Sequence, residues 1–251
     1  MSIWAERRKQ AIIWVIILLI FGVIGIAAWT VLHREPTCSD RQKNQNEQGV
    51  DCGGVCDLMC KDSVQEPVIL WQRFFKVSEG IYTAATMIQN PNLASQAADV
   101  PYRIRLYDED GVTIFERNDY MTLYPKYNFP IIDSGIRTLE RVPVRMTFEF
   151  TGEPVWYRAQ EQVNSLSITN DVVFNEKTSP RIDASVRNDS NVLKKSVKVA
   201  ALVYDPEGNV MAVSQTVVDA VAPHGSSKVV FSWPEPFTAP ILKKELIILP
   251  Y

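Results

Sequence analysis

The stretch Leu106-Tyr-Asp-Glu-Asp-Gly-Val112 has a counterpart later in the chain, Leu202-Val-Tyr-Asp-Pro-Glu-Gly-Asn-Val210. In both, an apolar run ends in Tyr-Asp, and a glycine follows three residues after the aspartate. An aspartate can accept hydrogen bonds from the backbone of a turn, and glycine tolerates positive φ. Each stretch therefore predicts a strand that ends in a tight turn, after which the next strand returns antiparallel.

Alternating apolar and polar residues extend this pattern from about residue 67 onward. Val142, Val144, Met146, Phe148 and Phe150 share one face of a predicted strand. The stretch 197–203 alternates similarly, although Ala200 and Leu202 make it apolar on both sides. Asn90-Pro-Asn92 and Asn188-Asp-Ser190 precede the two motifs and are interpreted as turns rather than ligand sites. This periodicity predicts an all-β structure after residue 66.

The repeated motif predicts a duplicated domain, with one β-sandwich at 67–169 and a second at 170–251. We expect Leu166-Ser-Ile168 to match Leu246-Ile-Ile248 as the last strand of each copy. The boundary then falls near 169–171, and with no Gly/Ser linker there we expect a semi-rigid rod. Matching Phe148–Pro154 with Phe231–Pro236 predicts about 15 extra residues in the first copy, within Asn118 to Arg141.

That extra segment is the candidate partner-binding surface. It contains four aromatic residues, Tyr120, Tyr124, Tyr127 and Phe129. Aromatic side chains are enriched in protein-binding hot spots, so the segment is expected to contact another envelope protein or a second copy of the chain. The alternative is that these aromatics cover the edge of their own sandwich.

The second copy resembles the FxLYD family of small β-sandwich domains. The resemblance rests on Val186-Arg-Asn188, Val203-Tyr-Asp205-Pro-Glu-Gly208 and the Ala222-Pro-His-Gly225 turn, with Ala201 at the position of the family's phenylalanine. It implies two tandem immunoglobulin-like β-sandwiches without a catalytic site. Such domains occur on membrane-anchored or secreted bacterial proteins.

All four cysteines, Cys38, Cys52, Cys56 and Cys60, lie in a polar segment at 36–61. A segment this polar needs covalent or metal links to hold a structure, and two disulfides would supply them. Three pairings remain open. Zinc is the alternative, although the spacing is not that of paired zinc-knuckle cysteines. Calcium is a second possibility, through the oxygen ligands Asp40, Asn44, Glu47 and Asp51.

The same segment resembles a short motif of bacterial and some eukaryotic surface proteins, Cys-x-Asp-Gly-x-x-Asn-x-x-Glu-x-Gly-Val-Asp-Cys-Gly-Gly-x-Cys. The matching residues are Cys38, Asp40, Asn44, Glu47, Gly49, Val50, Asp51, Cys52, Gly53, Gly54 and Cys56. Arg41 stands where the motif has glycine. The resemblance implies an extracytoplasmic module, because disulfides persist in oxidising compartments.

Upstream of the cysteines, residues 11–32 form an apolar stretch without a charged side chain. A helix of this length can cross a bilayer, and its long apolar run favours an uncleaved anchor over a cleaved signal peptide. Arg7, Arg8 and Lys9 adjoin the stretch, so residues 1–10 are expected to be a short cytoplasmic tail and the later domains extracytoplasmic.

Composition restricts the function further. The formal net charge is −3 and no basic patch is interleaved with aromatics, which argues against nucleic-acid binding. There are two histidines, and no catalytic motif is found, so we predict a protein that is not an enzyme. The sequence predicts a membrane-anchored structural or binding protein of the cell envelope. The alternatives are an accessory subunit of a secretion or pilus machine, and a protein that binds or acts on carbohydrate, with Trp156 and Tyr157 as stacking residues.

Overall fold

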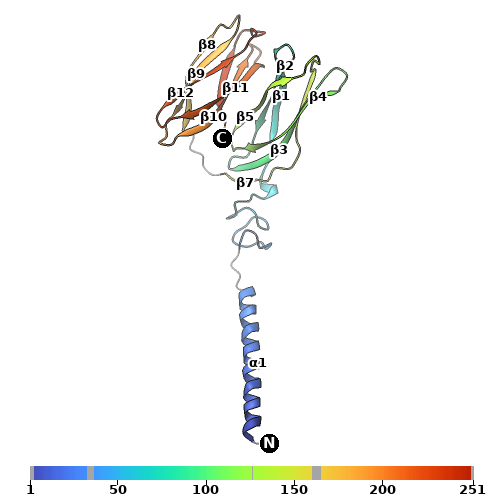
Figure 1. Ribbon diagram of the computed structural model, residues 1–251, viewed down its shortest axis with the longest axis vertical. Helices are drawn as coiled ribbons and strands as arrows, with labels where there is room; N and C mark the ends of the chain where they lie inside the picture. The colour runs from blue at the N-terminus through green and yellow to red at the C-terminus, as the bar shows by residue number, and fades with distance from the viewer. Residues whose placement is uncertain (1–2, 33–36, 126, 160–164, 250–251) are drawn as a thin grey trace. The chain divides into compact units, whose positions relative to one another are not determined.

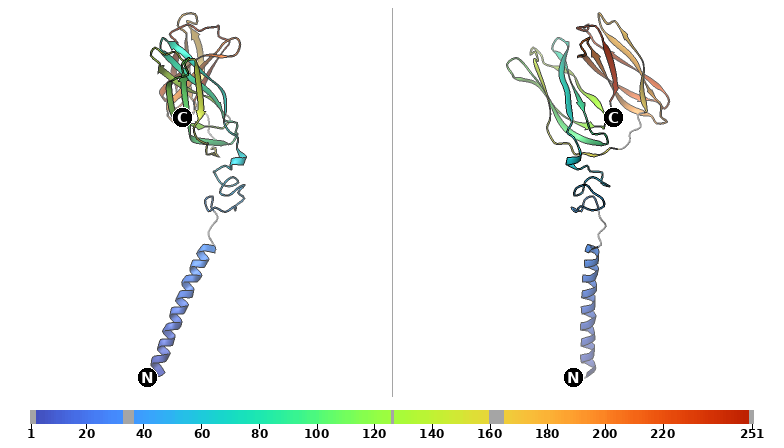
Figure 2. Two further views of the ribbon diagram at one scale, coloured as in Figure 1. Left: turned by 90° about the vertical axis from the view of Figure 1, so that its right-hand side faces the viewer. Right: turned by 180° about the vertical axis from the view of Figure 1, so that it is seen from behind.

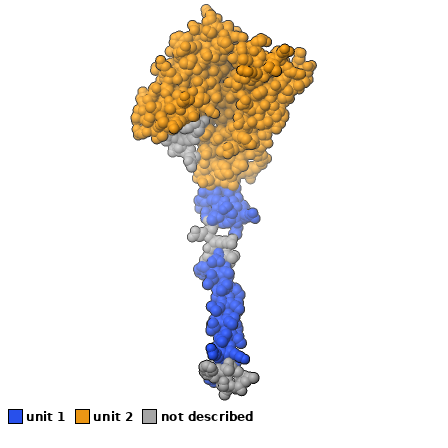
Figure 3. All heavy atoms as spheres, in the orientation of Figure 1, with its two compact units in different colours: residues 1–56 blue, residues 57–251 orange. Residues whose placement is uncertain are grey.

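The computed structural model describes residues 3–32, 37–125, 127–159 and 165–249. The chain divides into two compact units, residues 1–56 and residues 57–251 (Figure 3). Among the described residues, the first unit contains the single α-helix and most of the cysteine segment, and the second contains all of the strands. The predicted fold class, an all-β part that follows one N-terminal helix, is confirmed.

The helix α1 runs from Ile3 to Leu32 (Figure 1). Its segment Arg7–Thr30 comprises 24 residues and is long and apolar enough to cross a membrane, and none of that segment is buried by the rest of the chain. A helix of this kind near an N-terminus serves as a membrane anchor or as a signal sequence.

The first sandwich follows a short 3₁₀ helix, η1 (Lys61–Ser63). One sheet has the strand order β1-β2-β5, and the other has the order β4-β3-β6, with β7 paired to β3 (Figures 1 and 2). All pairings are antiparallel. The strands are β1 (Val68–Ser78), β2 (Ile81–Gln89), β3 (Ser95–Tyr107), β4 (Thr113–Leu123), β5 (Asn128–Arg137), β6 (Arg145–Phe150) and β7 (Tyr157–Arg158).

The second sandwich has the same plan. Its sheets have the orders β12-β9-β8 and β11-β10-β13, again with antiparallel pairing. Its strands are β8 (Leu166–Phe174), β9 (Arg181–Asn188), β10 (Lys194–Tyr204), β11 (Val210–Val221), β12 (Ser226–Ser232) and β13 (Lys243–Ile248).

Apart from the two-residue strand β7, the strands β1–β6 of the first sandwich correspond in chain order to β8–β13 of the second. The first strands begin at 68 and 166 and the last strands, β6 and β13, at 145 and 243, so both pairs are offset by 98 residues. The prediction of about 15 extra residues in the first copy is therefore wrong. Phe148 on β6 corresponds to Leu246 on β13, whereas Phe231, its predicted match, lies one strand earlier on β12. Phe148 and Phe231 lie in similar phenylalanine-containing strands, Arg145–Phe150 and Ser226–Ser232, which have different places in their sheets.

The pairing also corrects the predicted join. Leu166–Ile168 opens the second sandwich as part of β8, which pairs with β9, and it does not close the first sandwich. The predicted boundary at 169–171 falls inside β8, at a register shift between Thr169 and Val172 where Asn170 has a φ of +56°.

The predicted turn chemistry is confirmed in both copies. Asp108 accepts the Gly111 N–H on its backbone oxygen and the Val112 N–H on its side chain, at 3.0 and 2.8 Å. Asp205 does the same with Gly208 and Asn209, at 3.0 and 2.7 Å. Both glycines have positive φ, 76° and 80°, so each turn uses the conformation that glycine adopts most readily.

The two sandwiches pack sheet against sheet instead of forming the predicted rod. The strand β10 decides this arrangement, because its side chains alternate between two cores. Val197, Val199, Ala201 and Val203 lie in the core of the second sandwich, whereas Ala200 and Leu202 belong to a cluster centred on the first. Arg73 of β1 adds a polar contact by donating to the Val210 carbonyl at 3.2 Å. A strand that is apolar on both faces must be covered on both. The opposite sheet of the second sandwich covers one face of β10, and the first sandwich covers the other.

Candidate functional site

The cysteine segment is held by covalent links. Cys38 and Cys56 form a disulfide, Cys52 and Cys60 are also disulfide-bonded, and no cysteine is free. The predicted disulfide module is therefore present. Because the sulfurs are bonded to one another, they offer no thiolate for the zinc alternative.

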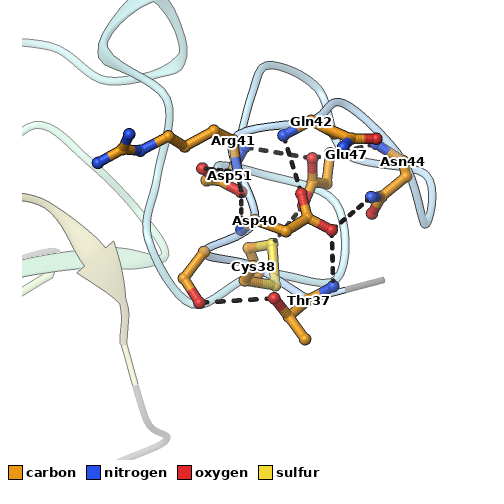
Figure 4. Close-up of a disulfide and its surroundings, with 10 residues drawn as sticks. Thr37, Cys38, Asp40, Arg41, Gln42, Asn44, Glu47 and Asp51 are labelled. Carbon is orange, nitrogen blue, oxygen red and sulfur yellow. Dashed lines mark hydrogen bonds between the residues drawn. A yellow bond between two sulfur atoms is a disulfide. The ribbon is translucent and has the colours of Figure 1, made fainter. Parts of the chain in front are cut away.

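Carboxylates act as the polar core of this module, because they accept backbone N–H groups (Figure 4). Asp51 accepts from the Asp40 and Arg41 amides at 3.0 and 2.9 Å. Asp40 accepts from the Thr37 and Gln42 amides and from the Asn44 side chain, at 3.1, 2.8 and 2.8 Å. The Asn44 side chain and these two amides hold the pKa of Asp40 below its ordinary value.

Glu47 is the most buried carboxylate of the module, with 5% of its surface exposed. One oxygen accepts the Asn44 and Asp51 amides at 3.3 and 3.2 Å, and the other lies 3.2 Å from the Cys56 sulfur. A disulfide sulfur carries no proton, so the second contact is close packing rather than a hydrogen bond.

The proposed calcium ligands do not converge. Among the described residues, the carboxylate oxygens of Asp40, Glu47 and Asp51 do not form a cluster that could surround one ion. The possible ligand atoms that do lie close together belong to Glu47, Cys38 and Cys56. Each carboxylate is turned instead toward backbone donors. Asn44 Oδ1 is buried without a hydrogen bond, but a Ca²⁺ ion requires six to eight oxygen ligands. The module thus uses these residues to fold, and calcium stays an untested prediction.

Glycine is required where the module is tightest. A Cβ atom on Gly54 would lie 2.0 Å from the Asn46 carbonyl oxygen, and the φ of Gly54 is +61°. Gly53 is similar, because a Cβ atom there would lie 2.7 Å from the Gln48 side chain, and its φ is +68°. These contacts explain the Cys-Gly-Gly sequence of the motif.

The four predicted partner-binding aromatics differ in exposure. Tyr120 on β4 is 68% exposed, Tyr124 and Tyr127 are half-buried, and Phe129 on β5 is only 5% exposed. Phe129 and Tyr127 pack with the first core, as the alternative interpretation expected. Tyr120 therefore remains the most accessible aromatic of the predicted surface.

Three of these aromatics line one hollow of about 270 Å³, where the second sandwich completes the wall. Tyr120, Tyr124 and Phe129 come from the first sandwich, and Lys198 and Gln215 from the second. Tyr102 also lines this hollow, and burial raises its pKa to about 12. Sequence reasoning missed Tyr102, Lys198 and Gln215, because nothing local indicates that residues of β10 and β11 line the same hollow as residues of β4.

A second hollow, of about 360 Å³, contains the fourth aromatic, Tyr127. It runs along Glu245–Ile248 of β13 and Leu166–Ile168 of β8, with Tyr127 and Asn128 of the first sandwich at its border. No local sequence pattern marks this hollow, because it depends on two strands that lie almost 80 residues apart and on the neighbouring sandwich.

The remaining candidates for chemistry lie apart from these hollows. His224 is exposed in a turn with a φ of +52°, and its ring contacts the Asn191 side chain at 2.6 Å. Trp156, a predicted stacking residue for carbohydrate, is 7% exposed and packs in the first core, so it offers no open ring face. Its neighbour Tyr157 is 44% exposed.

No protein-family model matches the chain, and no curated protein matches its sequence. Solved structures with partial likeness include a red sea bream transglutaminase, with 13% identity, 73% of this chain and 32% of that chain covered, and a TM-score of 0.24. Bacteroides uniformis β-glucuronidase 2 has 13% identity, coverages of 64% and 22%, and a TM-score of 0.23. The chain therefore spans less than a third of the length of either protein.

Proposed function

We propose that this protein is a membrane-anchored binding protein of the cell envelope, with its sandwiches outside the membrane. The observation that carries the proposal is the fully disulfide-bonded cysteine module, which follows directly after an apolar helix long enough to span a bilayer. Disulfides persist in oxidising compartments, which supports an extracytoplasmic position for the residues after the helix. The basic residues before the helix support a cytoplasmic N-terminus.

The binding role follows from the surface of the sandwiches. Tyr120 presents an exposed aromatic ring beside a hollow that combines apolar walls with Asp119, Lys198 and Gln215. Exposed aromatics beside a concave surface with a few polar groups are typical of binding sites. The partner is another envelope protein or a second copy of this chain.

Photo-crosslinking in intact cells tests this role. A photoreactive phenylalanine at position 120 is expected to give a crosslinked band, because Tyr120 borders the hollow. The matched control is the same substitution at Tyr157, which is also exposed and does not line either hollow. Equal crosslinking at both positions, or none at position 120, would contradict the proposed surface.

An accessory subunit of an envelope machine is the second candidate. It predicts that the crosslinked partner also stays bound at fixed stoichiometry after detergent extraction. Dissociation on extraction would favour a transient binding role over a permanent subunit.

A further inference from the structure

We propose that the outer edge of β13 binds an extended strand of a partner protein, which adds to the sheet β11-β10-β13. This inference rests on the binding role proposed above, and it names a second surface and the chemistry of its occupant. Strand addition of this kind takes its affinity from main-chain hydrogen bonds and its specificity from alternate side chains.

The free edge of β13 follows from its place in the sheet. β13 is a terminal strand and pairs only with β10 among the described strands. Just after β13, the Leu249 N–H donates to the Lys198 carbonyl on the β10 side at 2.9 Å. Because successive residues of a strand point their N–H groups to opposite sides, the N–H groups of Leu246 and Ile248 point away from β10.

The first sandwich shows what a protected edge looks like. Phe148, the counterpart of Leu246, donates its outward N–H to the Gln72 side chain at 2.6 Å. The position 98 residues after Gln72 is Asn170, which is exposed and has a φ of +56° at the register shift in β8. The second sandwich thus has the shorter side chain of Asn170, on a backbone at a register shift, where the first sandwich has Gln72 to accept the outward N–H.

Two edge strands of the first sandwich carry features that discourage strand addition. β5 contains Pro130, which has no N–H, and β4 presents a run of polar residues at 116–119. β13 has charges at Lys243, Lys244 and Glu245, but Leu246-Ile-Ile248 has no charge, proline or register shift. The last half of β13 therefore lacks these protections.

The hollow beside this edge has room and the right chemistry for one strand. It extends along four residues of β13, which at ~3.3 Å per residue gives roughly 13 Å of edge. Leu246, Ile248 and Ile168 are only partly buried against the second core. An incoming strand with apolar residues at alternate positions would complete this packing while its backbone pairs with β13.

The shape of the hollow favours a protruding segment over a second β13. β8 borders the hollow on one side, and Tyr127 and Asn128 border it on another. Two edges that both lie inside such hollows cannot approach closely enough to pair, whereas an extended tail or loop can enter. The occupant is accordingly an extended partner segment with alternating apolar side chains.

Hydrogen exchange of the full-length protein in lipid nanodiscs tests the proposal. The probe is a ten-residue peptide of alternating valine and threonine with lysines at both ends, and the control peptide has an N-methyl group on every valine and threonine, so that neither edge can donate. The unmodified peptide is expected to slow exchange in residues 243–249 by about tenfold, and the methylated peptide is expected to have no effect, since it cannot donate the hydrogen bonds.

A pair of variants tests whether the peptide binds at the hollow beside β13. Asn128→Trp fills the border of the hollow and is expected to weaken peptide binding by about tenfold, whereas Asn118→Trp, at an exposed asparagine of β4, leaves it unchanged. Unchanged unfolding temperatures would show that both variants fold. Absence of protection at millimolar peptide, or equal effects of the two peptides or of the two variants, would overturn the proposal. Such a failure leaves crosslinking at Tyr120 unaffected, so it is distinguishable from failure of the binding role.

Discussion

At the scale of single residues, two buried asparagines hold equivalent turns in the two sandwiches. Asn188 is fully buried, and its side-chain nitrogen donates to the Val192, Val221 and Ala222 carbonyls at 2.8, 3.2 and 3.2 Å. Asn90, 2% exposed, donates in the same way to Ser95, Leu123 and Tyr124. Each side chain thus ties the connection that follows its own strand to the end of a later strand, β4 or β11, which gives asparagine a structural role at both positions.

Replacing either asparagine is expected to be costly. Asn188→Ala leaves buried carbonyls without donors and should lower the free energy of unfolding by about 2–4 kcal/mol. Asn90→Ala should cost a similar amount. Urea unfolding of the full-length protein measures both, with Asn118→Ala at an exposed position as the control. Losses below about 0.5 kcal/mol for both variants would contradict this role.

A pH dependence is expected in the cysteine module. The pKa of Asp40 is lowered by Asn44 and by backbone amides, so its ionised form is favoured in the folded state. A group with a depressed pKa contributes stability above its unfolded value, 3.8, and loses it as the pH falls through the folded value. The protection factors of the Thr37 and Gln42 amides, which are their exchange rates relative to an unfolded chain at the same pH, should therefore fall as the pH drops below 3.8, and Asp40→Asn should remove this acid-dependent fall. A fall of the same size in the variant would contradict the assignment.

At the scale of elements, the hydrogen bond from the Phe148 N–H of β6 to the Gln72 side chain of β1 can be tested directly. Gln72→Ala removes the acceptor from the half-buried N–H of Phe148 and should lower the free energy of unfolding by about 1–2 kcal/mol. Gln72→Glu keeps an acceptor and should lose less. Denaturant unfolding distinguishes the two variants. Equal losses would show that the hydrogen bond contributes nothing beyond side-chain packing.

Turns and strand alternation were predictable from the sequence, because they depend on a few neighbouring residues. Asp108, Gly111 and their counterparts specify their turns locally. The pairing of whole strands was not predictable from local pattern, since Phe148 and Phe231 lie in similar strands but at different places in their sheets. The same limit applies to the hollows. Tyr120 was identifiable as an exposed aromatic, whereas Lys198 joins its hollow only through packing between sandwiches.

At the scale of the whole molecule, the shared core predicts cooperative unfolding of the two sandwiches. Leu202 is fully buried and extends from the second sandwich into the cluster of the first. Leu202→Ala is expected to lower the free energy of unfolding by about 2–5 kcal/mol. It should also separate one calorimetric transition of residues 57–251 into two. Val203→Ala, directed to the second core alone, should keep a single transition. Two separate transitions already in the unmodified protein would contradict the shared core.

For the molecule as a whole, our central proposal is that the apolar helix anchors the protein in a membrane and that the cysteines lie outside the cytoplasm. The disulfides indicate an oxidising compartment, and the helix has the length of a membrane span. Orientation is the part of this account on which the binding role depends, because both hollows must be accessible to envelope partners.

The measurement that tests this claim most directly is thiol labelling of intact cells with a membrane-impermeant maleimide, with and without an impermeant reductant. The account predicts labelling of Cys38, Cys52, Cys56 and Cys60 only after reduction, and without permeabilisation. Free thiols that react only after permeabilisation, with no need for reduction, would place the module in the cytoplasm and contradict the account.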